Sequence, residues 1–476
     1  MSEPDARAVH RERRVAHWNA VARRLDRYDR ANRGYHARLQ AIYRWLIPTG
    51  QRVLEVGCGA GDLLAAVAPA AGVGVDFSPE MIRLAAARHP ALRFVCADAH
   101  DFDLADTFDF VILSDVINDV WDVQQLLDAV RRHTTPASRI VMNFYSRLWE
   151  VPLRAAQGLA WSRPMLEQNW LTMGDVTNLL ALADLEVVRH STEVLWPFRT
   201  PGIAPLFNRV LAKTWPFSMA ALTHVLVARQ TASVVRARPT VSVVVPARNE
   251  AGNIEQIFQR TPEMGAGTEL VFVEGHSRDD TMAAIEGAIA RHPERRAIAL
   301  RQSGIGKGDA VREGFARASG DVLMILDADL TVAPEDLPRF YDTLLSGKGD
   351  FVNGVRLVYP MQDQAMRFFN LAGNKAFSVL FSWLLGQRIK DTLCGTKVLW
   401  RRDYLRIAAN RSYFGDFDPF GDFDLLFGAA KLSCKLVEMP VRYHARTYGE
   451  TNIQRWRHGA LLLRMSAIAA VKLKWV

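Results

Sequence analysis

The chain has 476 residues, of which 49% are hydrophobic and 23% are charged, and its formal net charge is +8. A chain of this length exceeds the core of one ordinary domain, so we expect two domains, and the composition excludes a disordered or fibrous protein. The positive charge is compatible with phosphorylated ligands, anionic membranes or nucleic acids, and it selects none of them.

Cysteines stand at positions 58, 96, 394 and 434, without a Cys-x-x-Cys pair. This spacing is typical of reduced cytoplasmic thiols rather than of a disulfide framework or a zinc site. The charged N-terminus lacks the apolar core of a signal peptide, and no uninterrupted apolar stretch reaches the ~18 residues of a membrane span. We therefore expect a cytoplasmic protein without a transmembrane helix.

Residues 1–48 are rich in arginine, with acidic and aromatic residues interleaved. This pattern predicts helices with a solvated basic face, and a nucleic-acid-binding arm is the less favoured interpretation. A role at a membrane surface also stays open.

A glycine-rich loop follows the first predicted strand, in Val53-Leu-Glu-Val-Gly-Cys-Gly-Ala-Gly-Asp62. Glycines at such a turn let the backbone bend tightly and let a ligand approach a helix N-terminus. Roughly twenty residues later the strand 73–76 ends in Asp76, an acid suited to ribose hydroxyls. Further strands lead to Asp98 and to Asp115. This β–α alternation predicts a doubly wound parallel sheet with its ligand site at the strand carboxyl ends.

Through these motifs, residues 15–230 closely resemble the class I S-adenosylmethionine-dependent methyltransferases, which have a Rossmann-like fold. An NAD-binding loop is less favoured, because the glycines follow Gly-x-Gly-x-Gly rather than Gly-x-Gly-x-x-Gly. The resemblance implies S-adenosylmethionine as cofactor. It places the methionine part of the cofactor at Glu55, Gly57, Gly59 and Gly61. It places the ribose at Asp76, with Phe77 as a further cofactor-binding residue, and the adenine at Asp98 and Ala99. Ser114 and Asp115 would face the transferred methyl group.

Residues 140–145 and 221–229 are predicted as later strands of the same sheet. The tryptophan- and proline-rich segment between them is either an acceptor-binding cap of irregular helices or ordinary core, and the methyl acceptor stays open. Residues 231–239 are polar, basic and short, so we expect a linker between domains 1–230 and 240–476.

The second domain again alternates strands and helices, with a buried strand at 322–326 that ends in Asp327-Ala-Asp329. Two carboxylates at a strand's carboxyl end repel each other, which indicates a hard divalent cation that carries a phosphorylated ligand. The sequence Gly304-Ile-Gly-Lys-Gly308 is not a phosphate-binding P-loop, since Gly308 stands where that loop needs Ser or Thr.

Five ordered signatures connect residues 240–450 with one family. They are Val-Val-Pro-Ala-Arg-Asn-Glu (244–250), Gly-Lys-Gly-Asp-Ala-Val-Arg-Glu-Gly (306–314), Asp-Ala-Asp (327–329), Asp-Thr-Leu-Cys-Gly-Thr-Lys (391–397) and Gly-Asp-Phe-Asp-Leu-Leu (421–426). The region strongly resembles the family 2 glycosyltransferases of GT-A fold, in particular the dolichol-phosphate mannose synthase and dolichyl-phosphate β-glucosyltransferase group.

The resemblance implies a nucleotide-sugar donor, a UDP- or GDP-hexose, and Mg²⁺ or Mn²⁺ held by Asp327 and Asp329. It places the nucleotide at Pro246, Arg248, Glu250, Glu274 and Lys307, and donor or acceptor phosphate at Arg356, Lys397 and Arg446. The family usually has Asp-Asp or Asp-Gly where Glu274-Gly275 stands, and a metal-facing Gln in some members where Thr331 stands. The base preference and a third metal ligand therefore stay open.

Asp422 is the candidate general base, because an acceptor hydroxyl must lose its proton to a nearby carboxylate. A polyprenyl phosphate is already anionic and needs no base, in which case Asp422 or Asp424 orients groups or binds metal. An acid that merely favours a helix start is the remaining interpretation.

Residues 368–385 and 455–476 are largely apolar, and the second stretch has cations and Trp at its ends. They are predicted either as interfacial helices at a lipid surface or as buried core helices.

The sequence thus predicts a bifunctional enzyme, with methyl transfer in the first domain and inverting, metal-dependent hexose transfer to polyprenyl phosphate or a lipid- or glycan-linked acceptor in the second. We expect it in the cytoplasm, with peripheral contact to the inner face of the membrane. The alternative is a glycosyltransferase with a non-catalytic, S-adenosylmethionine-binding regulatory domain. A nucleic-acid methyltransferase is less favoured, since Ser114-Asp-Val-Ile117 stands in place of an Asn-Pro-Pro-Tyr-like motif, and no nucleic-acid partner is expected.

Overall fold

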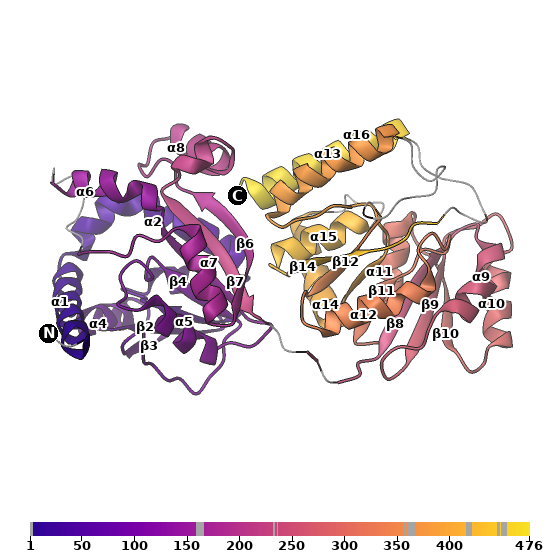
Figure 1. Cartoon of the computed structure of the whole chain (residues 1–476), viewed down its shortest axis with the longest axis horizontal. Coiled ribbons are helices and arrows are strands. Elements are labelled where there is room, and N and C mark those ends of the chain that lie inside the picture. Colours follow the sequence, from indigo (N-terminus) through magenta and orange to yellow (C-terminus); the bar gives the residue numbers. More distant parts are fainter. Residues whose placement is uncertain are drawn as a thin grey trace. The chain divides into compact units, whose positions relative to one another are not determined.

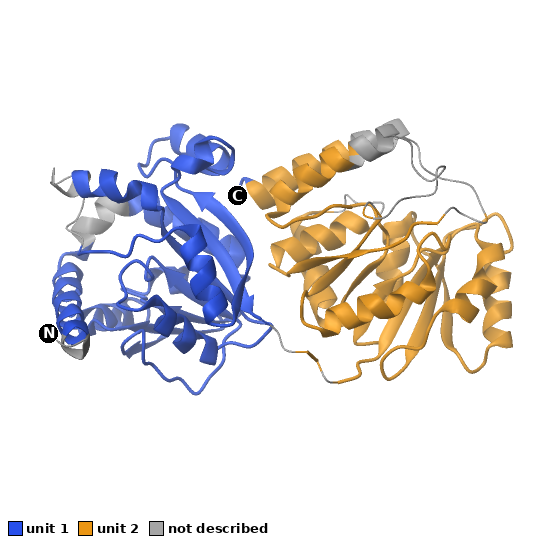
Figure 2. Ribbon diagram, in the orientation of Figure 1, with its two compact units in different colours: residues 1–231, 475–476 blue, residues 232–474 orange. Residues whose placement is uncertain are grey.

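A computed structural model of the chain describes residues 3–158, 166–231, 234–235, 237–356, 358, 368–415, 421–444, 448 and 455–476. The chain divides into two compact units, one of residues 1–231 with 475–476 and the other of residues 232–474 (Figure 1 and Figure 2). Each unit contains a seven-stranded sheet with helices packed on it, so the predicted α/β class is confirmed for both halves.

The sheet of the first unit has the strand order β3-β2-β1-β4-β5-β7-β6. All its pairings are parallel except those of β7, which runs antiparallel to both β5 and β6. The strands are β1 Arg52–Val56, β2 Ala71–Asp76, β3 Arg93–Cys96, β4 Phe110–Ser114, β5 Arg139–Tyr145, β6 Leu185–Glu193 and β7 Thr223–Gln230. Strand β6 was not predicted, because its polar residues interrupt the apolar alternation that identifies a strand.

Helices cover both faces of this sheet. Helices α5 and α7 share a core with one face, while α2 and α3 pack on the other through residues such as Leu39, Tyr43 and Leu64. Ser78 caps helix α4, since its hydroxyl accepts a hydrogen bond from Met81 N in the first turn of that helix. The helices are α1 Glu3–Ala22, α2 Leu25–Leu46, α3 Asp62–Ala66, α4 Pro79–Arg88, α5 Val123–Arg132, α6 Glu150–Gly158, α7 Met173–Leu182 and α8 Ile203–Pro205, with the short helical segments η1 Arg147–Trp149, η2 Leu206–Val210, η3 Leu211–Lys213 and η4 Phe217–Ala220.

The sheet of the second unit has the order β10-β9-β8-β11-β13-β12-β14, and β13 runs antiparallel to its two neighbours. Strand β11 is buried along its whole length, as its apolar sequence predicted. The strands are β8 Val241–Ala247, β9 Thr268–Glu274, β10 Arg296–Arg301, β11 Val322–Ile325, β12 Phe351–Val355, β13 Lys397–Trp400 and β14 Leu436–Pro440.

Helices α9, α10 and α12 share a core with one face of this sheet, and α11 packs on the other, where a Cβ on Gly314 would overlap Val244. Helices α13 and α16 lie side by side and bury Phe381 and Met465 (Figure 1). No helix in the described part of the chain combines the length and apolarity needed to cross a bilayer. The helices are α9 Ile254–Arg260, α10 Thr281–Arg291, α11 Lys307–Arg317, α12 Leu337–Leu345, α13 Phe368–Leu385, α14 Arg401–Ala409, α15 Asp422–Lys431 and α16 Arg455–Ala469, with η5 Ala251–Asn253, η6 Pro334–Asp336, η7 Arg411–Tyr413 and η8 Ala470–Lys474.

Two candidate active sites

The glycine loop after β1 is held in place by the acid that ends β2. Gly57, Gly59 and Gly61 have φ angles of 75°, 51° and 77°, in the left-handed region that favours glycine. Gly59 N donates a 2.9 Å hydrogen bond to Asp76 Oδ2, and Ser78 N donates one of 2.9 Å to Asp76 Oδ1. Burial raises the pKa of Asp76 to about 6, although these two amides oppose the shift. The structure thus brings together the loop and the acid that the sequence paired.

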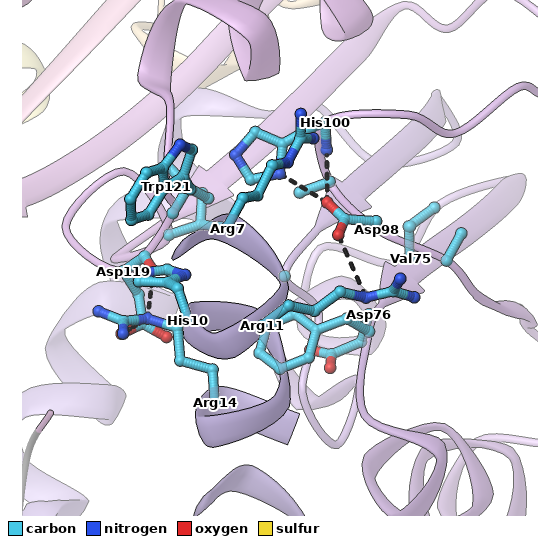
Figure 3. Close-up of a pocket in the computed structure, with 16 residues that line it drawn as sticks. Arg7, His10, Arg11, Arg14, Val75, Asp76, Asp98, His100, Asp119 and Trp121 are labelled. Carbon is cyan, nitrogen blue, oxygen red and sulfur yellow. Dashed lines mark hydrogen bonds and ion pairs between the residues drawn. The ribbon is translucent and has the colours of Figure 1, made fainter. Parts of the chain in front are cut away.

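A pocket lies beside this loop, between the strand ends and the N-terminal helix α1 (Figure 3). Helix α1 contributes Arg7, His10, Arg11 and Arg14 to its wall. Arg14 is buried, where its Nε donates to Asp119 Oδ1 at 3.1 Å, so the basic residues of this helix are only partly the solvated face that was predicted. The remaining lining residues are Gly57, Val75, Asp76, Phe77, Ala97, Asp98, Ala99, His100, Val116, Asp119, Val120 and Trp121.

Asp98 is fixed in this pocket by a neighbouring histidine. Asp122 N donates to His100 Nε2 at 3.0 Å, so the proton of the neutral ring is on Nδ1, which donates to Asp98 Oδ1 at 2.6 Å. Arg11 Nε lies 3.4 Å from Asp98 Oδ2 (Figure 3). The hydrogen bond from His100 is the main reason why the pKa of Asp98 falls to about 2. Asp98 therefore remains an ionised hydrogen-bond acceptor at neutral pH.

A second cavity shares Gly57 with the first and is lined by Glu55, Ser114 and Asp115. Glu55 is buried, and its Oε2 has no hydrogen-bond partner among the described residues. Burial raises the pKa of Glu55 well above its ordinary value. All the predicted cofactor residues except Gly61 line one of these two cavities, and Gly61 lies at the N-terminus of α3. The lining residues are Glu55, Gly57, Gly59, Asp76, Phe77, Asp98, Ala99 and Ser114.

A polar network that the sequence did not predict surrounds Asp115. The hydroxyl of Tyr35 on α2 donates to both carboxylate oxygens of Asp115, at 2.8 and 3.0 Å, and Asn143 Nδ2 also donates to Oδ1. Tyr43, two turns further along α2, donates to Asn143 Oδ1 at 2.8 Å. The aromatic residues of α2 were visible in the sequence, but only the packing of α2 on β4 and β5 assigns them this role.

The second unit has its own pocket at the carboxyl ends of β8, β9 and β11. Of the predicted residues it gathers Pro246, Arg248, Glu250, Lys307, Asp327 and Asp329. The other described residues of its wall are Ala247, Val273, Gly275, His276, Gln302, Ser303, Gly304, Ile305, Gly306, Ala310 and Ala328.

Three other predicted binding residues lie outside the wall of this pocket. Glu274 is buried next to the pocket and accepts a hydrogen bond from Ser277 N. Arg356 makes a two-pronged ion pair with Asp391, with Nε–Oδ2 and Nη2–Oδ1 distances of 2.7 and 2.9 Å. Lys397 is fully buried, and Arg446 lies outside the described residues.

The two predicted metal ligands have defined partners. Lys307 Nζ lies 2.5 Å from Asp327 Oδ1. Burial opposes both charges, yet the ion pair prevails, so that the pKa of Asp327 is lowered and that of Lys307 is raised. Thr331 orients Asp329, since its amide and its hydroxyl donate to Oδ1 at 3.1 and 2.7 Å. A Cβ on Gly395 would overlap both Asp327 and Lys307, so the close approach of these two side chains requires a glycine at this position.

Gly308, which excluded a P-loop, lies against the residue that precedes α15. A Cβ on Gly421 would overlap Gly308 Cα, so the N-termini of α11 and α15 touch through two glycines. This contact places Asp422, the first residue of α15, near the pocket.

Two family models match separate stretches of the chain. Residues 53–137 match the model of a methyltransferase domain, and residues 242–405 match that of glycosyl transferase family 2. The chain is 29% identical to glycosyltransferase AglJ of Haloferax volcanii over 47% of this chain and 69% of that protein. It is 28% identical to a dolichol-phosphate mannosyltransferase of Pyrococcus furiosus over 45% of this chain and 59% of that protein.

Among solved structures, glucosyl-3-phosphoglycerate synthase from Mycobacterium tuberculosis, in a complex with Mn²⁺ and UDP, is 21% identical, with a TM-score of 0.35, over 49% of this chain and 80% of that one. By the two family-model matches, the chain combines a methyltransferase domain with a domain of glycosyl transferase family 2.

Proposed function

We propose that the second unit transfers a hexose from a UDP- or GDP-sugar to polyprenyl phosphate, with inversion at the anomeric carbon. The observation that carries this proposal is the pocket in which Arg248, Glu250 and Lys307 meet Asp327 and Asp329. A phosphate oxygen of the acceptor forms a bond to the anomeric carbon, the bond from that carbon to the donor diphosphate breaks, and the nucleoside diphosphate leaves. The name of the dolichol-phosphate mannosyltransferase relative supports a polyprenyl phosphate acceptor.

The residues of the pocket fit a divalent metal ion. Mg²⁺ is usually held by one or two carboxylates together with substrate phosphates and water, and Mn²⁺ accepts the same oxygen ligands. The pocket offers Asp327 and Asp329, and no group of three or more His, Cys, Asp or Glu side chains suited to a metal occurs among the described residues. Diphosphate oxygens would thus complete the shell. When bound, the metal ion stabilises the charge of the leaving diphosphate.

The side chains around the metal position have their own tasks. Lys307 holds Asp327 and adds positive charge beside the diphosphate, and Thr331 keeps Asp329 in one orientation. Arg248 and Glu250 border the nucleotide. Asp422 acts as a base only for a hydroxyl acceptor, because a polyprenyl phosphate is already ionised.

We propose that the first unit binds S-adenosylmethionine and transfers its methyl group. The cavities fit this cofactor, since a Cβ on Gly59 would point into open space and Glu55 Oε2 is buried without a partner among the described residues. Each oxygen of Asp76 accepts one amide hydrogen and has a second lone pair for a ribose hydroxyl. The cofactor supplies an electrophilic methyl group, and Asp115, held by Tyr35, faces the acceptor.

The deciding experiment measures hexose transfer to polyprenyl phosphate from a panel of UDP- and GDP-sugars, with and without Mn²⁺. We expect one sugar nucleotide to be used and transfer to require the metal. Undiminished transfer by the Asp327→Ala, Asp329→Ala double variant would refute the metal assignment. Binding of S-adenosylmethionine without turnover on any lipid-linked glycan would instead support a regulatory first unit. We place the reaction at the cytoplasmic face of the membrane, because a polyprenyl acceptor is anchored there.

A further inference from the structure

The first unit carries an apolar surface on the segments that follow β5 and β6. Seven large apolar side chains on these segments are between 49% and 80% exposed. A soluble monomer rarely exposes so many large apolar groups together unless the surface binds something. We define the cap surface by these residues, which are Leu148, Val151, Phe198, Leu206, Trp215, Phe217 and Met219.

Hydrogen bonds connect the two segments that carry the cap surface. Trp149 Nε1 donates a 2.9 Å hydrogen bond to Ala220 O, which connects the end of η1, directly before α6, with the end of η4. The side chain of Asn208 in η2 accepts from the amides of Leu195 and Trp196, at 2.8 Å each. The apolar residues of both segments therefore belong to the same part of the unit.

The charges around the cap surface are positive. The segment between β6 and β7, residues 194–222, contains no Asp or Glu, while Arg and Lys occur there three times. Arg147, Arg199 and Arg209 are exposed on the segments of the cap surface. The acids nearest in sequence are paired, Glu150 with Arg154 at 3.0 Å and the buried Glu193 with Lys213 at 2.9 Å. Exposed Trp, Phe, Leu and Met next to Arg is the composition of segments that lie in the interface of an anionic bilayer.

The cap surface is fixed to the scaffold near the proposed methyl-transfer site. Glu193 Oε2 lies 2.8 Å from Arg38 Nη2 on α2, and Glu193 Oε1 binds Lys213 of η3. A Cβ on Gly34 would overlap Pro197 O, so the backbone next to Phe198 rests on α2. The residue after Gly34 is Tyr35, whose hydroxyl donates to Asp115. The cap surface therefore borders the acceptor side of the cofactor cavity.

We propose that the cap surface docks the first unit on an anionic lipid bilayer, so that the unit takes a lipid-linked methyl acceptor from that bilayer. The docking is independent of hexose transfer. The lipid-linked class of the acceptor rests on the methyl transfer proposed above.

The test is flotation of the full chain with vesicles of phosphatidylcholine alone and with phosphatidylglycerol added. We expect binding to the anionic vesicles. The triple variant Phe198→Ser, Trp215→Ser, Met219→Ser should bind them about tenfold more weakly or worse, because each serine removes a large apolar side chain from the lipid contact. The control variant Leu182→Ser, which changes a side chain of 57% exposure on α7, should bind like the wild type.

Three results would overturn the proposal. One is undiminished vesicle binding by the triple variant. Another is loss of binding only in the Val379→Ser, Leu463→Ser variant, which would place the lipid contact on α13 and α16 of the second unit. The third is a wild-type dimer, seen by sedimentation, that the triple variant abolishes without a change in lipid binding, because the cap surface would then bind a second copy of the chain.

Fluorescence gives an independent measurement. Trp215 is 80% exposed, so brominated lipids should quench the wild type more than the Trp215→Phe variant. Equal quenching of both proteins would contradict the docking. Hexose transfer to a short, water-soluble polyprenyl phosphate should be unchanged in the triple variant, so a failed docking test leaves the proposed function of the second unit intact.

Discussion

The ammonium group of Lys397 lies 2.9 Å from the carboxylate Oδ1 of Asp422, and both side chains are buried. Lys397 also donates a hydrogen bond to the carbonyl oxygen of Cys394. The pair connects the start of β13 with the first turn of α15. We interpret Lys397 as a positioning residue for Asp422, whereas the phosphate-binding role taken from the family stays a prediction.

Lys397→Met should lower the free energy of unfolding by about 3–5 kcal/mol, because it leaves the carboxylate of Asp422 buried without its cation. The double variant Lys397→Met, Asp422→Leu should recover part of this loss, since it removes both charges. Urea unfolding measures both effects. The exposed Lys375→Met is the control and should change stability by less than about 0.5 kcal/mol. A double variant less stable than the single one would contradict the pairing.

Asp327→Asn and Asp329→Asn should each reduce hexose transfer by about a hundredfold or more, because each removes one anionic ligand from the proposed metal ion. Initial rates at several Mn²⁺ concentrations test this, and excess metal should recover part of the activity. Asp342→Asn changes an exposed acid on α12 and should keep the wild-type rate. Equal metal dependence in all three variants would count against the assignment.

Gly395→Ala should impair the proposed metal site of Asp327 and Asp329 without removing a charge. Its Cβ would overlap Asp327 and Lys307, so the ion pair and the metal position must shift. We expect transfer to fall by about tenfold or more, with a weaker apparent affinity for Mn²⁺. The matched control is Gly373→Ala on α13, where a Cβ meets nothing within 4 Å. Similar rates for the two variants would show that the close approach at Gly395 is unimportant.

The affinity for S-adenosylmethionine should depend on the protonation of Asp76. Burial raises the pKa of this acid to about 6, well above the ordinary value of an aspartate. Only the ionised carboxylate accepts from both ribose hydroxyls and the loop amide, so affinity should fall as the pH drops through about 6. Calorimetric titrations between about pH 7.5 and about pH 5 measure this.

The Asp76→Asn variant should bind more weakly and with a flatter pH profile, and an unchanged profile would point to another group. Because the folded pKa of Asp76 is raised, its stabilising contribution without cofactor is complete below the unfolded pKa. That contribution is lost as the pH rises through about 6, so the cofactor-free protein should gain stability from this group on acidification.

Glu193→Gln should destabilise the first unit by about 3–5 kcal/mol, because Arg38 and Lys213 would lose their shared buried carboxylate. Burial raises the pKa of Glu193, but Lys213 and Arg38 outweigh it and hold the pKa below its usual value. The contribution of Glu193 is thus present above the unfolded pKa of about 4.3 and is lost as the pH falls through the lower folded value.

Thermal unfolding of wild type and variant across this pH range should show the difference shrinking only under acid conditions. Glu80→Gln, which breaks an exposed pair with Arg83, is the control and should change stability by less than about 1 kcal/mol. A constant difference at all pH values would exclude the ion pair as its cause.

The sequence by itself determined both α/β sheets and the two pocket edges. Apolar runs that end in acids, such as Val322 to Asp329, predict both a buried strand and the position of its polar end, since parallel strands gather their carboxyl ends at one edge. For this reason the sequence could assign Asp76, Asp98, Asp327 and Asp329 to strand ends, where the first two line one pocket and the last two line another.

Only the tertiary structure decided which distant residues touch. Several contacts join residues that are far apart in the sequence, so the hydrophobic periodicity of a single helix or strand cannot reveal them. They are the pairing of Lys397 with Asp422, the close approach of Asp327 and Lys307 to Gly395, the Tyr35 network around Asp115 and the cap surface. Strand β6 was missed for a similar reason, because its mixed sequence is ordered by its partner β7. Periodicity reports which face of an element is buried, whereas the identity of a contact depends on how the elements pack, and packing is a property of the whole fold.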